Sequence, residues 1–298
     1  MPRERSARAL RKERLYGPPL EGEGMDLPAC AAWPEDLRVR VGTSGWAYRH
    51  WLGRLYPRRL PSAQALAHYA CRFPAVEVNS TYYRLPSEAV FDAWRAAVPP
   101  GFRFAVKAPG SVTHDKRLVD AEAETDELLA RCRRLGDRLG VVLVQLPPGF
   151  RADLPLLDAF LARLPRDVRV AVELRHRSWF ERDVRDLLAS RGAAFVVHDY
   201  GRKGSPLWAT SDLAYLRLHG PSGRYRGAYE AETLLQWAEQ VKEWRASGLE
   251  TYVFFNNDER GKSVRDALAL RGMLEPASPE APAPGPAAAP EGYRCGLV

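Results

Sequence analysis

The chain has 298 residues, of which 46% are hydrophobic and 27% are charged, and its formal net charge at pH 7 is +7. This length suits one large domain better than two small ones. No run of about 18 uninterrupted apolar residues occurs and no secretory signal is recognised, which argues against a membrane helix, so we expect a soluble, cytoplasmic protein without a membrane partner.

The two ends of the sequence differ from its middle. Residues 1–36 combine an Arg/Glu-rich stretch with several Gly and Pro residues, and residues 275–298 are dominated by Ala and Pro. Such segments bury too little apolar surface to offset the entropy lost on ordering. The sequence therefore predicts two disordered tails that flank one domain of residues 37–274.

Eight strand-like segments alternate with helical patterns between the tails. They are Val39–Thr43, Ala75–Ser80, Phe102–Ala108, Val141–Pro147, Val168–Arg175, Ala193–Asp199, Ala214–Gly220 and Thr251–Asp258. Apolar residues at helical spacing, such as Leu66, Tyr69 and Phe73, fill most intervals. Eight βα repeats of about 30 residues predict an α/β protein with a (β/α)8 TIM-type barrel. Residues 200–212 show no apolar period, so the sixth helix is predicted to be irregular or missing.

The four cysteines, Cys30, Cys71, Cys132 and Cys295, form no CxxC or zinc-like spacing. Two of them fall in the predicted tails. The sequence therefore indicates neither a disulfide framework nor a thiolate metal site.

Several predicted strands carry polar side chains at alternate positions near their C-terminal ends. In Val168–Arg175, for example, Glu173 and Arg175 alternate with Val172 and Leu174. Parallel strands covered by helices are normally near-continuous apolar runs, and a buried polar face needs water, partners or a ligand. Because barrel active sites form at the C-terminal strand ends, the alternation predicts a polar cavity there.

Seven motifs follow one another along the predicted barrel. They are VGTSGWAY at Val41–Tyr48, VEVNSTYYRLP at Val76–Pro86, FAVKAP at Phe104–Pro109, VLVQLPPGF at Val142–Phe150, VELRHRSW at Val172–Trp179, YLRLHG at Tyr215–Gly220 and VFFNND at Val253–Asp258. Together they resemble the YecE-like family, the domain of unknown function numbered seventy-two. The resemblance covers roughly residues 39–274 and implies a barrel related to the TIM barrel, but it supplies no reaction.

The candidate site residues lie at the predicted C-terminal strand ends and in the loops that follow. Glu77 and Glu173 are the acid/base candidates, because burial and nearby cations can give two carboxyl groups different protonation states. Lys107 is the third catalytic candidate, and with Arg175 and Arg217 it is predicted to hold an anion or a transition state. The other predicted substrate-binding residues are Ser44, Trp46, Asn79, His114, Gln145, His176, Asp199, His219, Arg226, Asn256 and Asn257.

Two readings compete with a catalytic site. The same charges fit an interlocked set of ion pairs, such as Glu173 with Arg175 and Glu77 with Lys107, that fills the barrel without catalysis. A divalent metal is also considered, with ligands drawn from His176, His198, His219, Glu173 and Asp199. No HxxxH or HxH spacing specifies it, so the metal is not favoured, and no metal ligand is assigned. The cofactor is left unknown, because no nucleotide-binding motif is present.

The excess of basic residues favours acidic ligands through long-range attraction, although a solvated Arg-rich surface explains the same charge. We predict a hydrolase or isomerase that acts on a phosphorylated, sugar-like or nucleic-acid-derived substrate, with the Arg226 segment as a lid. The alternatives are a non-catalytic module that binds or senses a small anion, and a metal-dependent phosphodiesterase that binds nucleic acid. The oligomeric state is left open.

Overall fold

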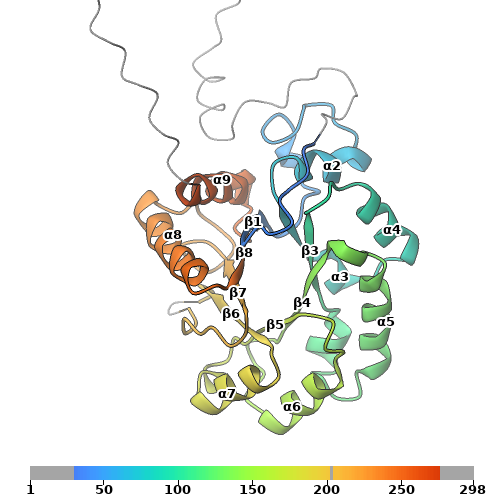
Figure 1. Cartoon of the computed structure of the whole chain (residues 1–298), viewed down its shortest axis with the longest axis vertical. Coiled ribbons are helices and arrows are strands. Elements are labelled where there is room, and N and C mark those ends of the chain that lie inside the picture. The colour runs from blue at the N-terminus through green and yellow to red at the C-terminus, as the bar shows by residue number, and fades with distance from the viewer. Residues whose placement is uncertain (1–29, 202–203, 276–298) are drawn as a thin grey trace, which may run out of the picture.

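The computed structural model describes residues 30–201 and 204–275, and the predicted tail residues 1–29 and 276–298 lie outside the described residues. At its centre, eight parallel strands form a barrel-shaped sheet with helices around the outside (Figure 1). The strands are β1 (Val39–Thr43), β2 (Ala75–Val78), β3 (Arg103–Lys107), β4 (Leu139–Gln145), β5 (Val170–Glu173), β6 (Ala194–His198), β7 (Leu213–Leu218) and β8 (Glu250–Phe255). The predicted (β/α)8 barrel is confirmed.

Helices cover the outer face of the sheet with their apolar sides. They are α2 (Ala65–Ala70), α3 (Ser80–Tyr83), α4 (Glu88–Ala96), α5 (Glu122–Arg133), α6 (Leu154–Arg163), α7 (Arg182–Ser190), α8 (Ala231–Ala246) and α9 (Lys262–Leu274). The periodic residues Leu157 and Leu161 of α6 and Leu234 and Val241 of α8 are buried, as their spacing predicts. Among the helices described, none combines the length and apolar character needed to cross a membrane.

The connection from β6 to β7 contains no helix within its described residues. Gly201 and Gly204 have φ angles of 80° and 61°, which a right-handed helix does not adopt, and Pro206 has no backbone N–H to donate. The predicted absence or irregularity of the sixth helix is therefore confirmed.

The barrel is nearly, rather than fully, closed by backbone pairing. The sheet order runs β1-β8-β7-β6-β5-β4-β3-β2, and β1 meets β2 through an isolated bridge between Ser44 and Glu77 in the described chain. The buried Tyr69 hydroxyl lies between the two strands, where it accepts from the Thr43 N–H at 2.8 Å and donates to the Ala75 carbonyl at 3.0 Å. This side chain satisfies backbone groups that a continuous ladder would otherwise pair.

Inward-facing residues form a packed layer in the middle of the barrel. Small side chains on one side face large aromatic side chains on the other, and the layer includes Ala75, Ala105, Leu143, Ala171, Ala194, Val196, Tyr215, Tyr252 and Phe254. Because these side chains fill the barrel interior, they separate the polar groups at the C-terminal strand ends from the polar groups at the N-terminal strand ends.

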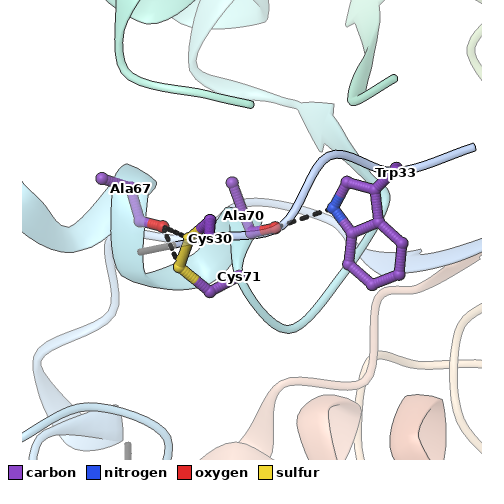
Figure 2. Close-up of a disulfide and its surroundings, with 5 residues drawn as sticks. All are labelled: Cys30, Trp33, Ala67, Ala70 and Cys71. Atoms are coloured by element: carbon purple, nitrogen blue, oxygen red, sulfur yellow. Dashed lines mark hydrogen bonds between the residues drawn. A yellow bond between two sulfur atoms is a disulfide. The ribbon is translucent and has the colours of Figure 1, made fainter. Parts of the chain in front are cut away.

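The N-terminal segment of residues 30–36 contacts the barrel instead of belonging to a disordered tail. Cys30 forms a disulfide with Cys71, just after α2, with their Cα atoms 5.0 Å apart (Figure 2). The Trp33 indole N–H donates to the Ala70 carbonyl at 2.8 Å, and Glu35 pairs with Arg103 at 2.7 Å. The expectations of a tail through residue 36 and of no disulfide were both wrong. Partners 41 residues apart leave no local spacing motif.

Reducing the Cys30–Cys71 disulfide is expected to lower the free energy of unfolding by about 2–4 kcal/mol, because the cross-link restricts the unfolded chain. Urea denaturation with and without dithiothreitol measures the difference. Cys71→Ser should behave like the reduced wild type in both buffers, and Cys132→Ser should keep the sensitivity to reductant. An identical wild-type transition in both buffers would contradict the link.

Candidate functional site

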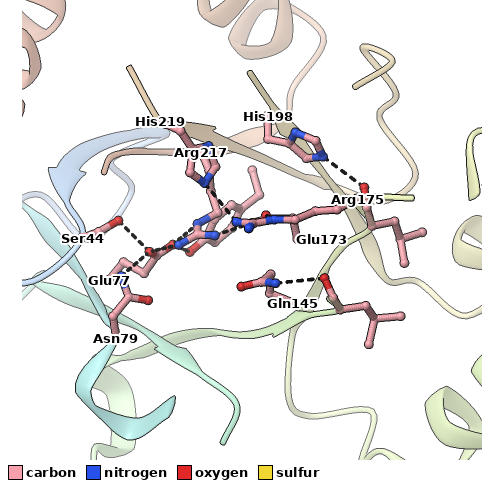
Figure 3. Close-up of polar contacts among 12 residues, drawn as sticks. Ser44, Glu77, Asn79, Gln145, Glu173, Arg175, His198, Arg217 and His219 are labelled. Atoms are coloured by element: carbon pink, nitrogen blue, oxygen red, sulfur yellow. Dashed lines mark hydrogen bonds and ion pairs between the residues drawn. The ribbon is translucent and has the colours of Figure 1, made fainter. Parts of the chain in front are cut away.

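Polar side chains converge at the C-terminal end of the barrel because parallel strands end at the same rim. Glu77 on β2, Lys107 on β3, Glu173 on β5 and Arg217 on β7 all occupy inward positions there, as Figure 3 shows for three of them together with Arg175. We call Glu77, Lys107, Glu173, Arg175 and Arg217 the charged cluster. Strand register places Gln145 beside Glu173 and His198 beside Arg217.

Arg217 is the centre of the charged cluster. Its Nε donates to Glu77 Oε2 at 2.9 Å and its Nη2 to Glu77 Oε1 at 2.7 Å, and its Nη1 donates to Glu173. Glu77 and Glu173 are 0% exposed and Arg217 is 1% exposed. One guanidinium therefore neutralises parts of two carboxylates from opposite sides of the barrel.

Glu77 receives hydrogen bonds from four side chains. Ser44 donates to Oε1 at 2.7 Å, Asn79 donates to the same atom at 3.2 Å, and Tyr215 donates to Oε2 at 2.7 Å, in addition to Arg217. Burial opposes ionisation of Glu77, but Arg217 and these donors hold its pKa below the ordinary value. Its oxygens thus have little remaining capacity to accept a substrate proton.

Glu173 is also held as a carboxylate. Arg175 Nε donates to its Oε1 at 2.5 Å, and Arg217 donates to its Oε2. Burial disfavours the charge, yet Arg175 and Arg217 hold the pKa of Glu173 well below its ordinary value. The geometry therefore gives both glutamates the same protonation state, rather than the split pair that an acid/base mechanism needs, and assigns them the role of orienting the two arginines.

Arg175 extends the cluster toward the loops. Its Nη1 donates to the Tyr225 hydroxyl at 3.1 Å, its Nη2 lies 3.3 Å from His219 Nε2, and its guanidinium carbon lies 3.9 Å from the centre of the Tyr200 ring. Stacking on an aromatic face stabilises a guanidinium while leaving its edge for hydrogen bonds. Arg175 thus connects the buried carboxylates with the aromatic loop residues.

Asp199 organises the loop that follows β7. It accepts from the His219 backbone N–H at 2.6 Å, lies 3.3 Å from His219 Nδ1, and also accepts from Tyr229. Burial lowers the pKa of His219 despite this carboxylate. A neutral His219 that donates from Nδ1 and accepts at Nε2 fits both of its neighbours.

Lys107 differs from the other charged residues of the cluster. Among the described residues, no hydrogen bond or ion pair reaches its Nζ, which lies 4.3 Å from the centre of the Tyr82 ring. Burial and the nearby Arg217 lower the pKa of Lys107 to about 8. When this lysine is protonated, the charged cluster contains three cations and two carboxylates, so it has one uncompensated positive charge.

Three further predicted residues lie beside Tyr82 or beside a glutamate of the charged cluster: His114 beside Tyr82, Asn79 beside Glu77 and Gln145 beside Glu173. His114 has its ring centre 4.9 Å from that of Tyr82, and burial, with a further contribution from Lys107, lowers its pKa. The buried Oδ1 of Asn79 has no hydrogen-bond partner in the described structure. Gln145, 3% exposed, donates its amide to the Leu146 carbonyl at 2.9 Å.

Other predicted site residues have structural contacts instead. Trp46 packs edge-on against Trp94 with ring centres 5.4 Å apart, and His176 Nδ1 accepts from the Ser178 N–H at 3.2 Å. Asn257 donates to the Gly227 carbonyl and to Asp266, both at 2.8 Å.

Two further predicted residues also make no contact with the cluster. The Asn256 backbone N–H pairs with the Leu218 carbonyl, and Arg226 is exposed. No described contact links any of these five predicted residues to the charged cluster.

Sequence reasoning missed the tyrosines of the site. Tyr82, Tyr200, Tyr215 and Tyr225 contact Lys107, Arg175 or Glu77, but aromatic residues in such segments are usually assigned to packing. Tyr215 was detectable, because it shares the inward face of β7 with Arg217.

The described part of the chain offers no group of three His, Cys, Asp or Glu side chains arranged to hold a metal ion. His198 and His219 have ring centres 6.2 Å apart, but His198 Nε2 lies 3.0 Å from the Leu174 carbonyl and His219 is held by Asp199 and Arg175. These contacts engage both ring nitrogens of His219 and Nε2 of His198, while the buried Nδ1 of His198 has no hydrogen-bond partner in the described structure.

The parallel barrel with a charged rim places the chain among the TIM-like α/β barrel proteins. Residues 40–290 match the family model described as "Protein of unknown function DUF72", and the chain belongs to this family. The family resemblance of the seven motifs is confirmed, and the match continues beyond residue 274, where the resemblance was expected to end.

Relatives cover the chain to different extents. The UPF0759 protein YecE of Escherichia coli K12 is 32% identical over 155 residues, 52% of this chain and 54% of YecE, so the match spans about half the length of that relative. The UPF0759 protein YunF of Bacillus subtilis is 24% identical over 80% of this chain and 95% of its own length. The crystal structure of a DUF72 family protein from Thermotoga maritima is 34% identical, with a TM-score of 0.72 over 79% of this chain and 98% of that one.

Proposed function

We propose that the charged cluster binds a small anionic substrate, of a phosphorylated or sugar-like kind, and that the protein acts on it as an isomerase or hydrolase with Lys107 at the reacting group. The observation that carries this proposal is the amine of Lys107, which has no hydrogen-bond or ion-pair partner among the described residues, beside four charges that are paired with one another.

The electrostatics of the cluster support anion binding. Both carboxylates are engaged by Arg175 and Arg217, so the excess charge belongs to Lys107. A fixed positive charge in a partly buried environment attracts an anion more strongly than the same charge in open solvent. Asn79 donates its amide to Glu77, and its amide oxygen, which has no hydrogen-bond partner in the described structure, offers an acceptor for a ligand hydroxyl group.

The pKa of Lys107 supports chemistry as well as binding. A pKa of about 8 lets the amine exchange a proton near neutral pH, which a lysine at its ordinary value of 10.5 does poorly. Proton transfer next to a bound anion is the step that isomerases and hydrolases of small phosphorylated compounds need. Glu77 and Glu173 contribute to this function by fixing the position of the arginines.

A non-catalytic anion-binding module is the second candidate. The saturation of Glu77 by Ser44, Asn79, Tyr215 and Arg217 favours it, because a rigid salt-bridge network needs no turnover to explain its presence. Turnover of any phosphorylated sugar by the wild type, lost in Lys107→Ala, would exclude this candidate. Binding with the same Lys107 dependence but no turnover across a substrate panel would favour it.

Lys107→Ala is expected to weaken the binding of inorganic phosphate by about tenfold to a hundredfold, the effect of losing one charge-assisted contact of about 1.5–3 kcal/mol. Isothermal titration at pH 7 gives the affinity, and a phosphate-dependent rise in melting temperature gives an independent measure. Arg226→Ala is the matched control, because this arginine is exposed and outside the cluster. An unchanged phosphate affinity in Lys107→Ala would remove Lys107 from the proposed site.

A further inference from the structure

Lys107 stands apart from the other lysines that the structure describes. Lys116 pairs with Glu124 at 2.7 Å, Lys242 with Glu239 at 2.8 Å and Lys262 with Glu259 at 2.6 Å. Lys107 is partly buried, yet within the described chain its Nζ has no carboxylate or carbonyl partner. A desolvated ammonium without an acceptor is unfavourable, and a neutral amine at the same place costs less free energy.

The arrangement of the arginines explains why this amine has no carboxylate partner in the part of the chain that the structure describes. Glu77 and Glu173 lie near enough to act on Lys107 electrostatically, but Arg217 binds Glu77 through two nitrogens and shares Glu173 with Arg175. A lysine with a purely structural role would be expected to take one of these carboxylates. The cluster instead places two guanidinium groups, whose charges lower the pKa of Lys107, and the Tyr82 ring near its amine, and a neighbouring cationic group is one of the features that make a lysine amine nucleophilic.

We propose that Lys107 forms an imine with a small carbonyl compound that carries an anionic group, such as an α-keto acid or a phosphorylated ketose. This inference rests on the proposed function, because it assigns a substrate class to the same anion-binding site. The carbonyl carbon would lie at Nζ, and the anionic group would lie toward Arg175.

Arg175 is suited to receive the anionic group. Its Nη1 donates to the Tyr225 hydroxyl, and Tyr225 is 41% exposed with a φ angle of 65°, a conformation that non-glycine residues rarely adopt. Displacement of this hydroxyl would free one guanidinium N–H for a carboxylate or phosphate oxygen while Nε stays on Glu173.

The chemical step balances without an oxidant or a reductant. The neutral amine of Lys107 attacks the carbonyl carbon, a C–N bond forms, and the carbonyl electron pair moves to oxygen, which takes up a proton. The nitrogen loses one proton to give the carbinolamine, and its lone pair then expels the hydroxyl group, which takes up a second proton and leaves as water. The protonated imine that remains loses its last N–H proton to solvent. His114, which contacts the same Tyr82 ring as Lys107, is placed to carry a proton between the oxygen and solvent.

The ionisation of Lys107 supports this reactivity. Lowering the pKa from 10.5 to about 8 increases the fraction of free amine at neutral pH by about 300-fold. Anion binding by Lys107 requires the ammonium, but imine formation requires the amine. Phosphate affinity should therefore fall as the pH rises through about 8, whereas the rate of imine formation should rise over the same interval.

Borohydride trapping tests the proposal on the full chain. The protein is incubated with pyruvate or with dihydroxyacetone phosphate, reduced with sodium borohydride, digested and analysed by mass spectrometry. We expect a reduced adduct on Lys107, at least tenfold above the labelling of Lys116, Lys242 and Lys262, which serve as controls in the same digest. Lys107→Arg keeps a positive charge and should abolish this adduct, and circular dichroism checks that it is folded.

The outcomes separate the two proposals. Labelling of Lys107 no greater than that of the three control lysines with both compounds overturns the imine. If the imine fails but phosphate still binds in a Lys107-dependent manner, the proposed anion-binding site stands without imine formation. If phosphate binding is also independent of Lys107, both proposals fall.

Discussion

Arg217→Met is expected to lower the free energy of unfolding at pH 7 by about 3–5 kcal/mol, because it leaves buried carboxylates without their principal partner. Arg217 makes two hydrogen bonds to Glu77 and one to Glu173, and all three side chains are at most 1% exposed. Methionine fills part of the volume but offers no donor. Urea denaturation followed by circular dichroism measures the loss.

Arg134→Met is the matched control. Arg134 also binds a carboxylate through two nitrogens, at 2.9 and 2.5 Å from Asp92, but both of these side chains are exposed. Exposed pairs contribute little because water and salt screen them, so the control should change stability much less. Similar losses in the two variants would contradict the argument that burial makes Arg217 indispensable.

The acid dependence follows from the same contacts. Glu77 and Glu173 have folded-state pKa values below the ordinary value of 4.5. Their contribution to the free energy of unfolding is therefore fully present above pH 4.5, and it is lost as the pH falls through their folded-state pKa values. The stability difference between the wild type and Arg217→Met should therefore narrow below about pH 4.5.

The fold and the position of the charged cluster were accessible from the sequence. The period-two alternation that places Glu173 and Arg217 on inward positions is a local property, and eight such segments separated by helical patterns define the barrel. The ends of the strands then determine which polar residues share a rim. No structure is needed to predict that Glu77, Glu173 and Arg217 meet.

The pairing within the cluster was not accessible, because it depends on contacts across the barrel. The competing, non-catalytic reading paired Glu77 with Lys107 from the neighbouring β3, but Arg217 reaches Glu77 from β7, 140 residues away in the chain. The Tyr69 hydroxyl between β1 and β2 and the disulfide of Cys30 with Cys71 are likewise long-range arrangements. Local patterns do not encode such pairings.

Trp46 is a residue that its motif assigned to the predicted site, but the described contact of its ring is a packing contact. It follows β1 and belongs to VGTSGWAY, but its ring packs against Trp94 of α4.

Lys107→Met is expected to raise the free energy of unfolding at pH 7 by about 3 kcal/mol, while it removes phosphate binding and the imine adduct. The folded-state pKa of Lys107 is about 8, compared with 10.5 when it is exposed, and each unit corresponds to about 1.4 kcal/mol. The native state therefore binds fewer protons than the unfolded state between these values, so the wild type gains stability as the pH rises from about 8 toward 10.5.

Denaturation of both proteins at pH 7 and pH 10 measures this effect. The advantage of Lys107→Met should be largest at or below about pH 8, where the wild-type ammonium is buried, and should shrink toward pH 10.5, where the unfolded lysine also loses its proton. Lys116→Met is the control, because Lys116 is paired with Glu124 and should show no such gain. If the wild type and Lys107→Met have equal free energies of unfolding at pH 7, Lys107 must have a partner that neutralises its charge. A gain in stability accompanied by a loss of ligand binding is what a residue retained for function should give.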